Sequence, residues 1–264
     1  MKIARIHLTE KEDIRFAVVK DDHYQLIECC PFCGNDLTDE TIDMDDATLL
    51  PPVDPPQIVA VGLNYRKHAV EGGMKIPEAP VLFVKTCNTI AGPKMPILLP
   101  KMAPDKVDYE CELVIVIGKE ARDVSEEDAL DYVLGYTCGN DVSARDCQLE
   151  QDVQWARGKC FDTFAPIGPW IETDIDGDNL NIKTILNGKT MQESNTSDLI
   201  FSCRKLVSYI SRCMTLYEGS IIMTGTPAGV GFAQDPQVWL KDGDTITVEI
   251  EGIGALTNPV EKES

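Results

Sequence analysis

The chain has 264 residues and a formal charge of −20, from 24 basic and 44 acidic side chains, and 43% of its residues are hydrophobic. Such a chain is long and apolar enough to bury a large core. Its acid excess repels phosphate groups, so we expect neither nucleic acid nor an anionic membrane surface as a partner. The apolar run 113–117 is far shorter than the ~20 residues that span a bilayer. No signal-peptide core follows Met1, so we expect a cytoplasmic protein.

Ten cysteines are spread along the chain. Cys111 and Cys138 lie in strand-like segments, where cysteine behaves as a small hydrophobic residue. A chain of this length folds without disulfides, so we interpret the cysteines as mostly free thiols in a reducing compartment. Cys30 and Cys33 have the CxxC spacing of half a zinc site or of a redox pair, but no second CxxC and no close histidine pair accompanies them. We interpret this segment as a turn with fortuitous cysteines.

The N-terminal segment is expected to form a separate, small β-rich unit. Residues 1–50 contain strand-like alternation of apolar and polar side chains. Residues 1–56 carry five basic and thirteen acidic side chains, a net charge of −8. The proline-rich segment 51–56 favours an extended, non-helical connection. We therefore predict a small N-terminal domain with its linker over 1–56 and a main domain over 57–264.

Short strand signals dominate the main domain. We predict strands at 57–63, 81–85, 109–118, 135–140, 180–186, 220–224 and 244–250. The acidic segment 125–128 has the pattern of a helix start, and 202–214 carries an apolar stripe of helical period. Asn187-Gly188 indicates a type I′ hairpin turn. Because the strands do not alternate regularly with helices, we predict an α+β fold rich in antiparallel or mixed sheet.

Closely spaced carboxylates mark a first candidate site. Asp108, Glu110 and Glu112 are two residues apart on a predicted strand, so their side chains are expected on one face. Their mutual repulsion favours a bound divalent cation: magnesium, manganese or calcium suits oxygen ligands, and zinc suits them less well. Asp141, at the end of another predicted strand, is a further candidate ligand. The alternative is an acidic edge that faces solvent.

His68 and Glu71 mark a second candidate site. A carboxylate three residues after a histidine can orient the imidazole and raise its basicity, as a general base requires. The alternative is an ordinary exposed pair on a short helix. The polar surroundings and the following Gly72-Gly73 pair lead us to expect that this helix packs against little and moves.

Two further segments carry candidate chemistry. Lys159 lies among apolar and aromatic residues, where an ammonium can polarise a carbonyl or pair with a substrate carboxylate, although a surface lysine often has such neighbours too. Residues 224–231 form a glycine-rich loop after an apolar run. It lacks the Gly-Lys-Ser/Thr ending of a phosphate-binding loop, so we expect it to offer backbone N–H groups to a small anion.

Together, in this order and spacing, these blocks resemble the fumarylacetoacetate hydrolase superfamily from about residue 59 to residue 260. The resemblance implies a mixed β-roll or β-sandwich fold, a homodimer, and a Mg²⁺ or Mn²⁺ site, with Ca²⁺ as a further candidate. It implies that the metal ligands are Glu110, Glu112 and Asp141. It also implies that the catalytic residues are His68, Glu71 and Lys159. The positions it implies for substrate binding are Arg145, Gln148, Gly225 and Thr226.

The reaction is left open by this resemblance, because members of the superfamily differ in what they do to an oxo acid. We favour hydrolysis of a carbon–carbon bond in an acylpyruvate or related β-diketo acid, with His68 activating water and Lys159 and Gln148 stabilising negative charge. The alternatives are an oxo-acid decarboxylase, an isomerase or tautomerase of an oxo dicarboxylic acid, and a ureidoglycolate lyase. A metal-binding scaffold without turnover is an alternative of another class. The expected partner is a small-molecule oxo acid.

Overall fold

The computed structural model describes the chain except for residues 10–11, 35 and 264. Its main sheet consists of β1 (Lys2–Leu8), β2 (Asp13–Val19), β3 (His23–Ile27), β4 (Leu37–Asp43), β5 (Ala47–Leu49), β6 (Ile58–Val61), β7 (Leu82–Lys85), β8 (Ile90–Ala91), β11 (Cys111–Ile117), β12 (Val133–Asn140), β14 (Ala165–Glu172) and β17 (Ile221–Met223). A second sheet consists of β9 (Ile97–Leu99), β15 (Asn181–Leu186), β16 (Lys189–Asn195), β18 (Thr245–Ile250) and β19 (Gly254–Lys262). The remaining elements are the pair β10 (Val107–Asp108) and β13 (Ser143–Ala144) and the helices α1 (Arg66–Glu71), α2 (Ala156–Lys159) and α3 (Cys203–Cys213).

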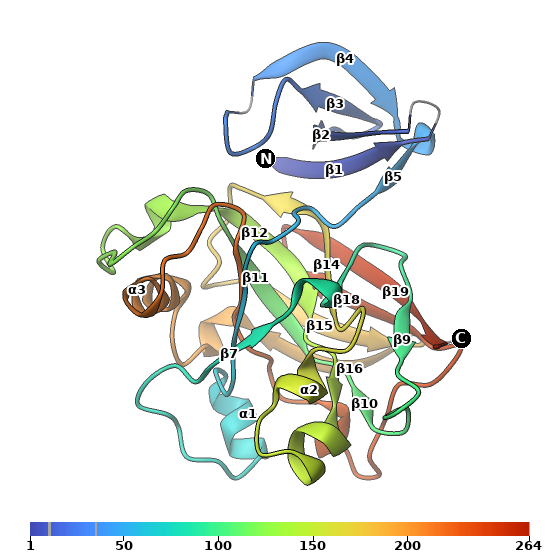
Figure 1. The fold of residues 1–264 in the computed structure, drawn as a ribbon, viewed down its shortest axis with the longest axis vertical. Helices are drawn as coiled ribbons and strands as arrows, with labels where there is room; N and C mark the ends of the chain where they lie inside the picture. The colour runs from blue at the N-terminus through green and yellow to red at the C-terminus, as the bar shows by residue number, and fades with distance from the viewer. Residues whose placement is uncertain (10–11, 35, 264) are drawn as a thin grey trace.

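The predicted α+β class and the strand-rich, mixed fold are confirmed (Figure 1). The main sheet runs in the order β4-β3-β2-β1-β14-β12-β11-β17-β6-β7, with β5 beside β1 and β8 beside β14, and the second sheet runs β16-β15-β18-β19-β9. Most neighbours are antiparallel, whereas β6 with β17, β8 with β14 and β9 with β19 are parallel. Regular crossover helices are absent from the described part of the chain, which agrees with the mixed architecture.

Strand β11 lies at the centre of the fold and is buried on both faces. Leu113 and Ile115 belong to the core that the second sheet and α3 cover, whereas Val114 and Val116 belong to a core on the opposite face. A strand covered on both sides needs apolar residues at every position, which explains the uninterrupted apolar run in the sequence. This burial fixes the strand that contains Glu112 and that follows directly after Glu110.

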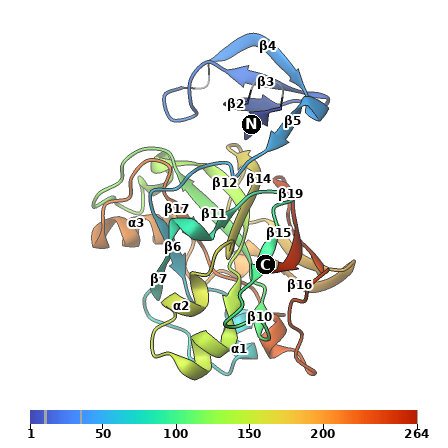
Figure 2. The ribbon, with the colours of Figure 1, turned by 45° about the vertical axis from the view of Figure 1, so that its right-hand side comes forward.

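Strands β1 to β5 form an N-terminal layer that lies beside the rest of the chain (Figures 1 and 2). This layer is joined to the main sheet by hydrogen bonding between β1 and β14, where Lys2 lies opposite Glu172 and Ile3 lies opposite Ile171. The division of the chain near residue 56 stays a prediction, because this pairing makes the N-terminal strands part of the main sheet.

Three local predictions have different outcomes. Asn187 and Gly188 have φ of 50° and 80° between β15 and β16, which confirms the type I′ hairpin. Helix α3 confirms the predicted helix, and Ser202 caps it by accepting a hydrogen bond from the backbone N–H of Lys205. The helix predicted to start at Ser125 is wrong: its side chain does cap the Asp128 N–H, but only one 3-10 turn follows before the chain enters β12.

Candidate active site

The paired ends of β11 and β12 bring three carboxylates together. Cys111 pairs with Asn140 in the antiparallel register, and the N–H of Asp141 donates to the carbonyl of Glu110 at 2.9 Å. Side-chain oxygens of Glu110, Glu112 and Asp141 consequently lie within 4.8 Å of one another. All three residues are buried. The candidate ligands are thus an internal cluster, and the alternative of a solvent-facing acidic edge is wrong for them.

Asp108 does not join this cluster, which corrects the prediction that it shares a face with the two glutamates. The strand is interrupted between β10 and β11, so the alternation of faces does not continue through Tyr109. The carboxylate of Asp108 instead accepts hydrogen bonds from Arg145 Nε at 2.8 Å and from the backbone N–H groups of Gly231 and Phe232 at 2.7 and 3.0 Å. Asp108 therefore positions Arg145.

Three buried cations contact the carboxylates. Lys159 Nζ lies 2.9 Å from Glu110 and 2.5 Å from Asp141, and Lys85 Nζ lies 2.5 Å from the other oxygen of Asp141. Arg145 lies 2.6 Å from Glu110. Lys159 is therefore a buried site residue and not a surface lysine. Sequence reasoning missed Lys85, because nothing except its place at the end of an apolar strand distinguished it from other lysines.

The buried charges do not balance. Burial, the largest influence, raises the pKa of Glu110, but the charges of Lys159 and Arg145 outweigh it and hold that pKa at about 2. Burial and the neighbouring charges of Asp141 and Glu110 raise the pKa of Glu112 well above its ordinary value. Glu112 accepts a hydrogen bond from the backbone N–H of Gly225 at 2.8 Å, and no described cationic side chain pairs with it.

The donor set fits a divalent oxygen-seeking cation. With Asp108 included, four carboxyl groups face three cationic side chains in this buried network, so ionisation of all four, Glu112 among them, would leave a net charge of −1. Hard cations such as Mg²⁺ and Mn²⁺ prefer carboxylate oxygens, and a cation beside Glu112 would supply the missing positive charge.

The candidate general base is already oriented. His68 Nδ1 lies 2.9 Å from Glu71 Oε2, and Glu71 Oε1 accepts a hydrogen bond from the Gly229 N–H at 2.9 Å. This arrangement leaves Nε2 of His68 available. Helix α1 is held at its start, where Arg66 donates to the carbonyls of Asp198 and Leu199, but Ala69 is its one buried residue. The expectation that this helix moves stays a prediction.

A cavity of about 210 Å³ connects the base to the carboxylates. Seven of the ten predicted site residues line it, namely His68, Glu71, Glu110, Arg145, Gln148, Lys159 and Thr226. The other three lie behind this lining: Asp141 accepts a hydrogen bond from Lys159, a carboxylate oxygen of Glu112 lies within 4.8 Å of Glu110, and Gly225 precedes Thr226 and donates to Glu112. Phe83, Trp155 and Phe232 supply an apolar wall that sequence reasoning did not single out.

The predicted substrate-binding residues are held by one another and by the fold. Arg145 Nη1 donates to Gln148 Oε1 at 2.8 Å, and Thr226 Oγ1 accepts a hydrogen bond from Gln192 Nε2 at 2.8 Å. Gly225 has a φ of 100°, and a Cβ at this position would lie 2.8 Å from Asn64 Cβ. The position therefore requires glycine.

Two family models match most of the chain. Residues 57–261 match the family described as fumarylacetoacetate (FAA) hydrolase C-terminal, and residues 1–52 match the family described as Rv2993c-like, N-terminal. The chain belongs to the fumarylacetoacetate hydrolase superfamily. The recognition made from the sequence motifs is thereby confirmed.

Members of this superfamily that resemble the chain have several names. A Dictyostelium discoideum protein named fumarylacetoacetate hydrolase domain-containing protein 2 homolog is 48% identical over 86% of this chain and 78% of its own length. The mitochondrial oxaloacetate tautomerase fahd2 of Xenopus laevis is 41% identical over 85% of this chain and 72% of its own length. The crystal structure of 5-carboxymethyl-2-hydroxymuconate delta-isomerase from Mycobacterium smegmatis superposes with a TM-score of 0.90, at 41% identity over 100% of both chains.

Among the described residues no helix is long and apolar enough to cross a membrane. A similar protein is named as mitochondrial. The cytoplasmic location expected from the sequence therefore stays a prediction.

Proposed function

We propose that this protein is a divalent-metal-dependent tautomerase or isomerase that moves a proton within a small oxo dicarboxylic acid. The observation that carries the proposal is the placement of an oriented imidazole, His68, in the same cavity as a buried carboxylate cluster that is short of positive charge. The names of the similar proteins, an oxaloacetate tautomerase and a muconate isomerase, support this reaction class. They favour it over the carbon–carbon hydrolysis preferred from the sequence.

Glu110, Glu112 and Asp141 would hold the cation, with Mg²⁺ or Mn²⁺ as the candidates that best suit an all-oxygen site and Ca²⁺ after them. When bound, the ion supplies Lewis acidity toward the oxo group and its neighbouring carboxylate. Arg145 and Gln148 line the same cavity and offer donors to a carboxylate of the substrate. An anionic oxo acid is therefore the substrate class that the cavity suits.

The proton transfer is assigned to His68. In the forward direction its Nε2 takes a proton from the carbon next to the ketone, and the protonated ring returns a proton to the oxygen, so that one C–H bond breaks and one O–H bond forms. Glu71 fixes the ring and stabilises its protonated form through the 2.9 Å contact. No water is consumed. Phe83, Trp155 and Phe232 limit the access of bulk water to the cavity.

The deciding experiment follows the fate of the substrate. The protein with Mg²⁺ or Mn²⁺ is mixed with oxaloacetate in its enol form, and the loss of enol absorbance is compared with the appearance of pyruvate and carbon dioxide. Tautomerisation removes the absorbance with no new product. Stoichiometric pyruvate would identify a decarboxylase and contradict the proposal.

A second substrate separates hydrolysis from isomerisation. An acylpyruvate is incubated under the same conditions, and release of pyruvate with a carboxylic acid is measured by chromatography. We expect deuterium exchange at the carbon between the carbonyls and no cleavage. Cleavage at a rate above that of enol conversion would support the carbon–carbon hydrolase and contradict the proposal. Metal binding without turnover of either compound would indicate a scaffold. Sedimentation of the intact protein would test the expected homodimer.

A further inference from the structure

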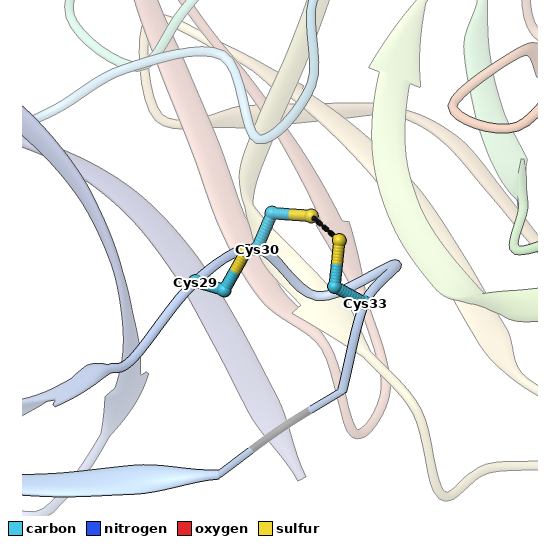
Figure 3. A group of neighbouring side chains, drawn as sticks. All are labelled: Cys29, Cys30 and Cys33. Atoms are coloured by element: carbon cyan, nitrogen blue, oxygen red, sulfur yellow. Dashed lines mark hydrogen bonds between the residues drawn. The ribbon is translucent and has the colours of Figure 1, made fainter.

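The loop between β3 and β4 carries three thiols that the proposed reaction does not use. The sulfur atoms of Cys29, Cys30 and Cys33 all lie within 4.8 Å of one another. Figure 3 shows the sulfurs of Cys30 and Cys33 facing each other in a hydrogen bond 3.0 Å long. Cys29 and Cys33 are exposed and Cys30 is partly exposed, so core packing does not explain why three thiols converge here.

The backbone of this loop holds the thiols in place. The N–H of Cys33 donates to the carbonyl of Cys30 at 3.1 Å, which closes a tight turn. Pro31 is buried within the turn, and Gly34 follows it with a φ of 140°, a conformation that favours glycine. The turn expected for this segment is therefore present, and the sulfur atoms of both of its cysteines lie next to each other.

Phe32 anchors the same turn to the main sheet. Its ring is partly buried against a core cluster that contains Val53 and Ile58. The ring of Phe32 also lies close to Gly219, in the segment that precedes β17, because a Cβ added at Gly219 would be 3.5 Å from the ring edge. A ligand-bearing turn fixed at its centre loses little conformational entropy when an ion binds.

The chemistry of the cluster favours a cation. Residues 1–56 carry a net charge of −8, which attracts positive ions. A thiolate is the form of cysteine that binds metal.

We propose that Cys29, Cys30 and Cys33 form a thiolate site for a borderline-soft divalent cation of the Zn²⁺ type, separate from the carboxylate site of the reaction. Zinc binds thiolate sulfur at about 2.3 Å in tetrahedral geometry. Sulfurs that lie within 4.8 Å of one another need only a small side-chain adjustment to reach one ion. Each thiol releases its proton to solvent on binding, and water or an external thiol fills the fourth position. The adjacent Cys29 is the signal that sequence reasoning overlooked, because it supplies the third ligand that a lone CxxC lacks.

Cadmium is a suitable probe, because its thiolate complexes absorb in the ultraviolet. The intact protein, kept reduced with a phosphine, is titrated with Cd²⁺ in excess Mg²⁺, which occupies the carboxylate site. We expect one equivalent of Cd²⁺ to give a thiolate charge-transfer band. Cys30→Ser should weaken Cd²⁺ binding by at least about 10- to 100-fold. Cys213→Ser, at another exposed cysteine, should leave the titration unchanged.

Folding of each variant is checked independently by its binding of Mn²⁺ in calorimetry, and Cys33→Ser replaces Cys30→Ser if the latter fails this check. A parent protein without the band, or a serine variant that retains it, would overturn the proposal. So would a reduced parent that gives no band but loses two thiols on exposure to air, since that outcome identifies a redox pair. Zn²⁺ should raise the midpoint of thermal unfolding of the parent and not of the Cys30 variant.

Discussion

The backbone N–H of Gly225 lies 2.8 Å from Glu112 Oε2 and donates a hydrogen bond to it, although the two residues are 113 positions apart. The glycine-rich loop after β17 thus holds the one carboxylate of the candidate metal cluster that no described cation pairs with. The loop does not offer this N–H to a substrate, as the sequence alone suggested. It fixes the side chain of Glu112, a candidate metal ligand.

Gly225→Ala should therefore weaken metal binding as well as folding. The new Cβ would meet Asn64 Cβ at 2.8 Å and would force a side chain into a φ of 100°. We expect a loss of about 1–3 kcal/mol in the free energy of unfolding and a lower affinity for Mn²⁺. Gly243→Ala is the matched control, because Gly243 has a φ of 87° with no atom near its Cβ position. Chemical denaturation and calorimetry with Mn²⁺ measure both effects, and equal Mn²⁺ affinities in the two variants would contradict this role.

Glu112→Gln should remove most of the affinity for the divalent cation. The amide keeps the shape of the side chain and its contact with Gly225 but deletes the charge that we expect the cation to neutralise. We expect the dissociation constant for Mn²⁺ to rise more than about 100-fold. Glu120→Gln on the surface serves as the control. A variant that binds Mn²⁺ as tightly as the parent would refute the ligand assignment.

His68→Ala should slow tautomerisation by about 10²- to 10⁴-fold while metal binding persists. The imidazole moves the proton, whereas the buried carboxylates that would bind the metal belong to other elements. His23→Ala is a matched control, since His23 also contacts a carboxylate, Asp22, at 2.7 Å but lies outside the cavity. The rate of enol disappearance is the measurement. Turnover by the His68→Ala variant at the rate of the parent protein would contradict the assignment of the proton transfer to His68.

Lys85→Met should destabilise the fold strongly. Lys85 is buried against Asp141 at 2.5 Å. Without Lys85, Asp141 keeps only Lys159, which it shares with Glu110, so the buried network loses one of its positive charges, at a cost of about 3–5 kcal/mol. Lys183→Met is the contrasting change, because Lys183 pairs with Glu249 at 2.9 Å on the surface, where an ion pair contributes about 0–1 kcal/mol. Urea denaturation compares the two. Similar losses of unfolding free energy in Lys85→Met and Lys183→Met would show that the charge of Lys85 contributes no more to stability than a surface charge.

Buried thiols should make the protein sensitive to alkali. Burial and the nearby charge of Asp178 raise the pKa of Cys203 well above its ordinary 9.0. Above pH 9 the unfolded chain releases a proton that the native state keeps, so stability falls as the pH rises, by about 1.4 kcal/mol per pH unit for this thiol. Cys203→Ala should reduce that slope. Cys213→Ala, at the exposed end of the same helix, should not. Unfolding free energies between pH 9 and 11 provide the test, with unchanged slopes for Cys203→Ala as the contrary result.

The features that the sequence determined by itself depend on neighbours close along the chain. An apolar stripe of helical period after a capping serine predicted α3, Asn187-Gly188 predicted the hairpin between β15 and β16, and an apolar run predicted the central strand β11. The paired glutamates and the histidine with its glutamate three positions on were also recognisable, because strand and helix geometry relate residues two or three apart.

Only the tertiary structure decided which distant charges meet. Asp108 does not share a face with the two glutamates, because the strand is interrupted, and it pairs with Arg145, 37 residues away. Lys85 joined the site from a strand 56 residues before Asp141. The deficit of positive charge around Glu112 is likewise a property of the assembled network. Burial makes such charge pairs strong, because the dielectric constant is low away from water. Burial in turn depends on how the second sheet and the rest of the main sheet pack against β11, which no local sequence pattern specifies.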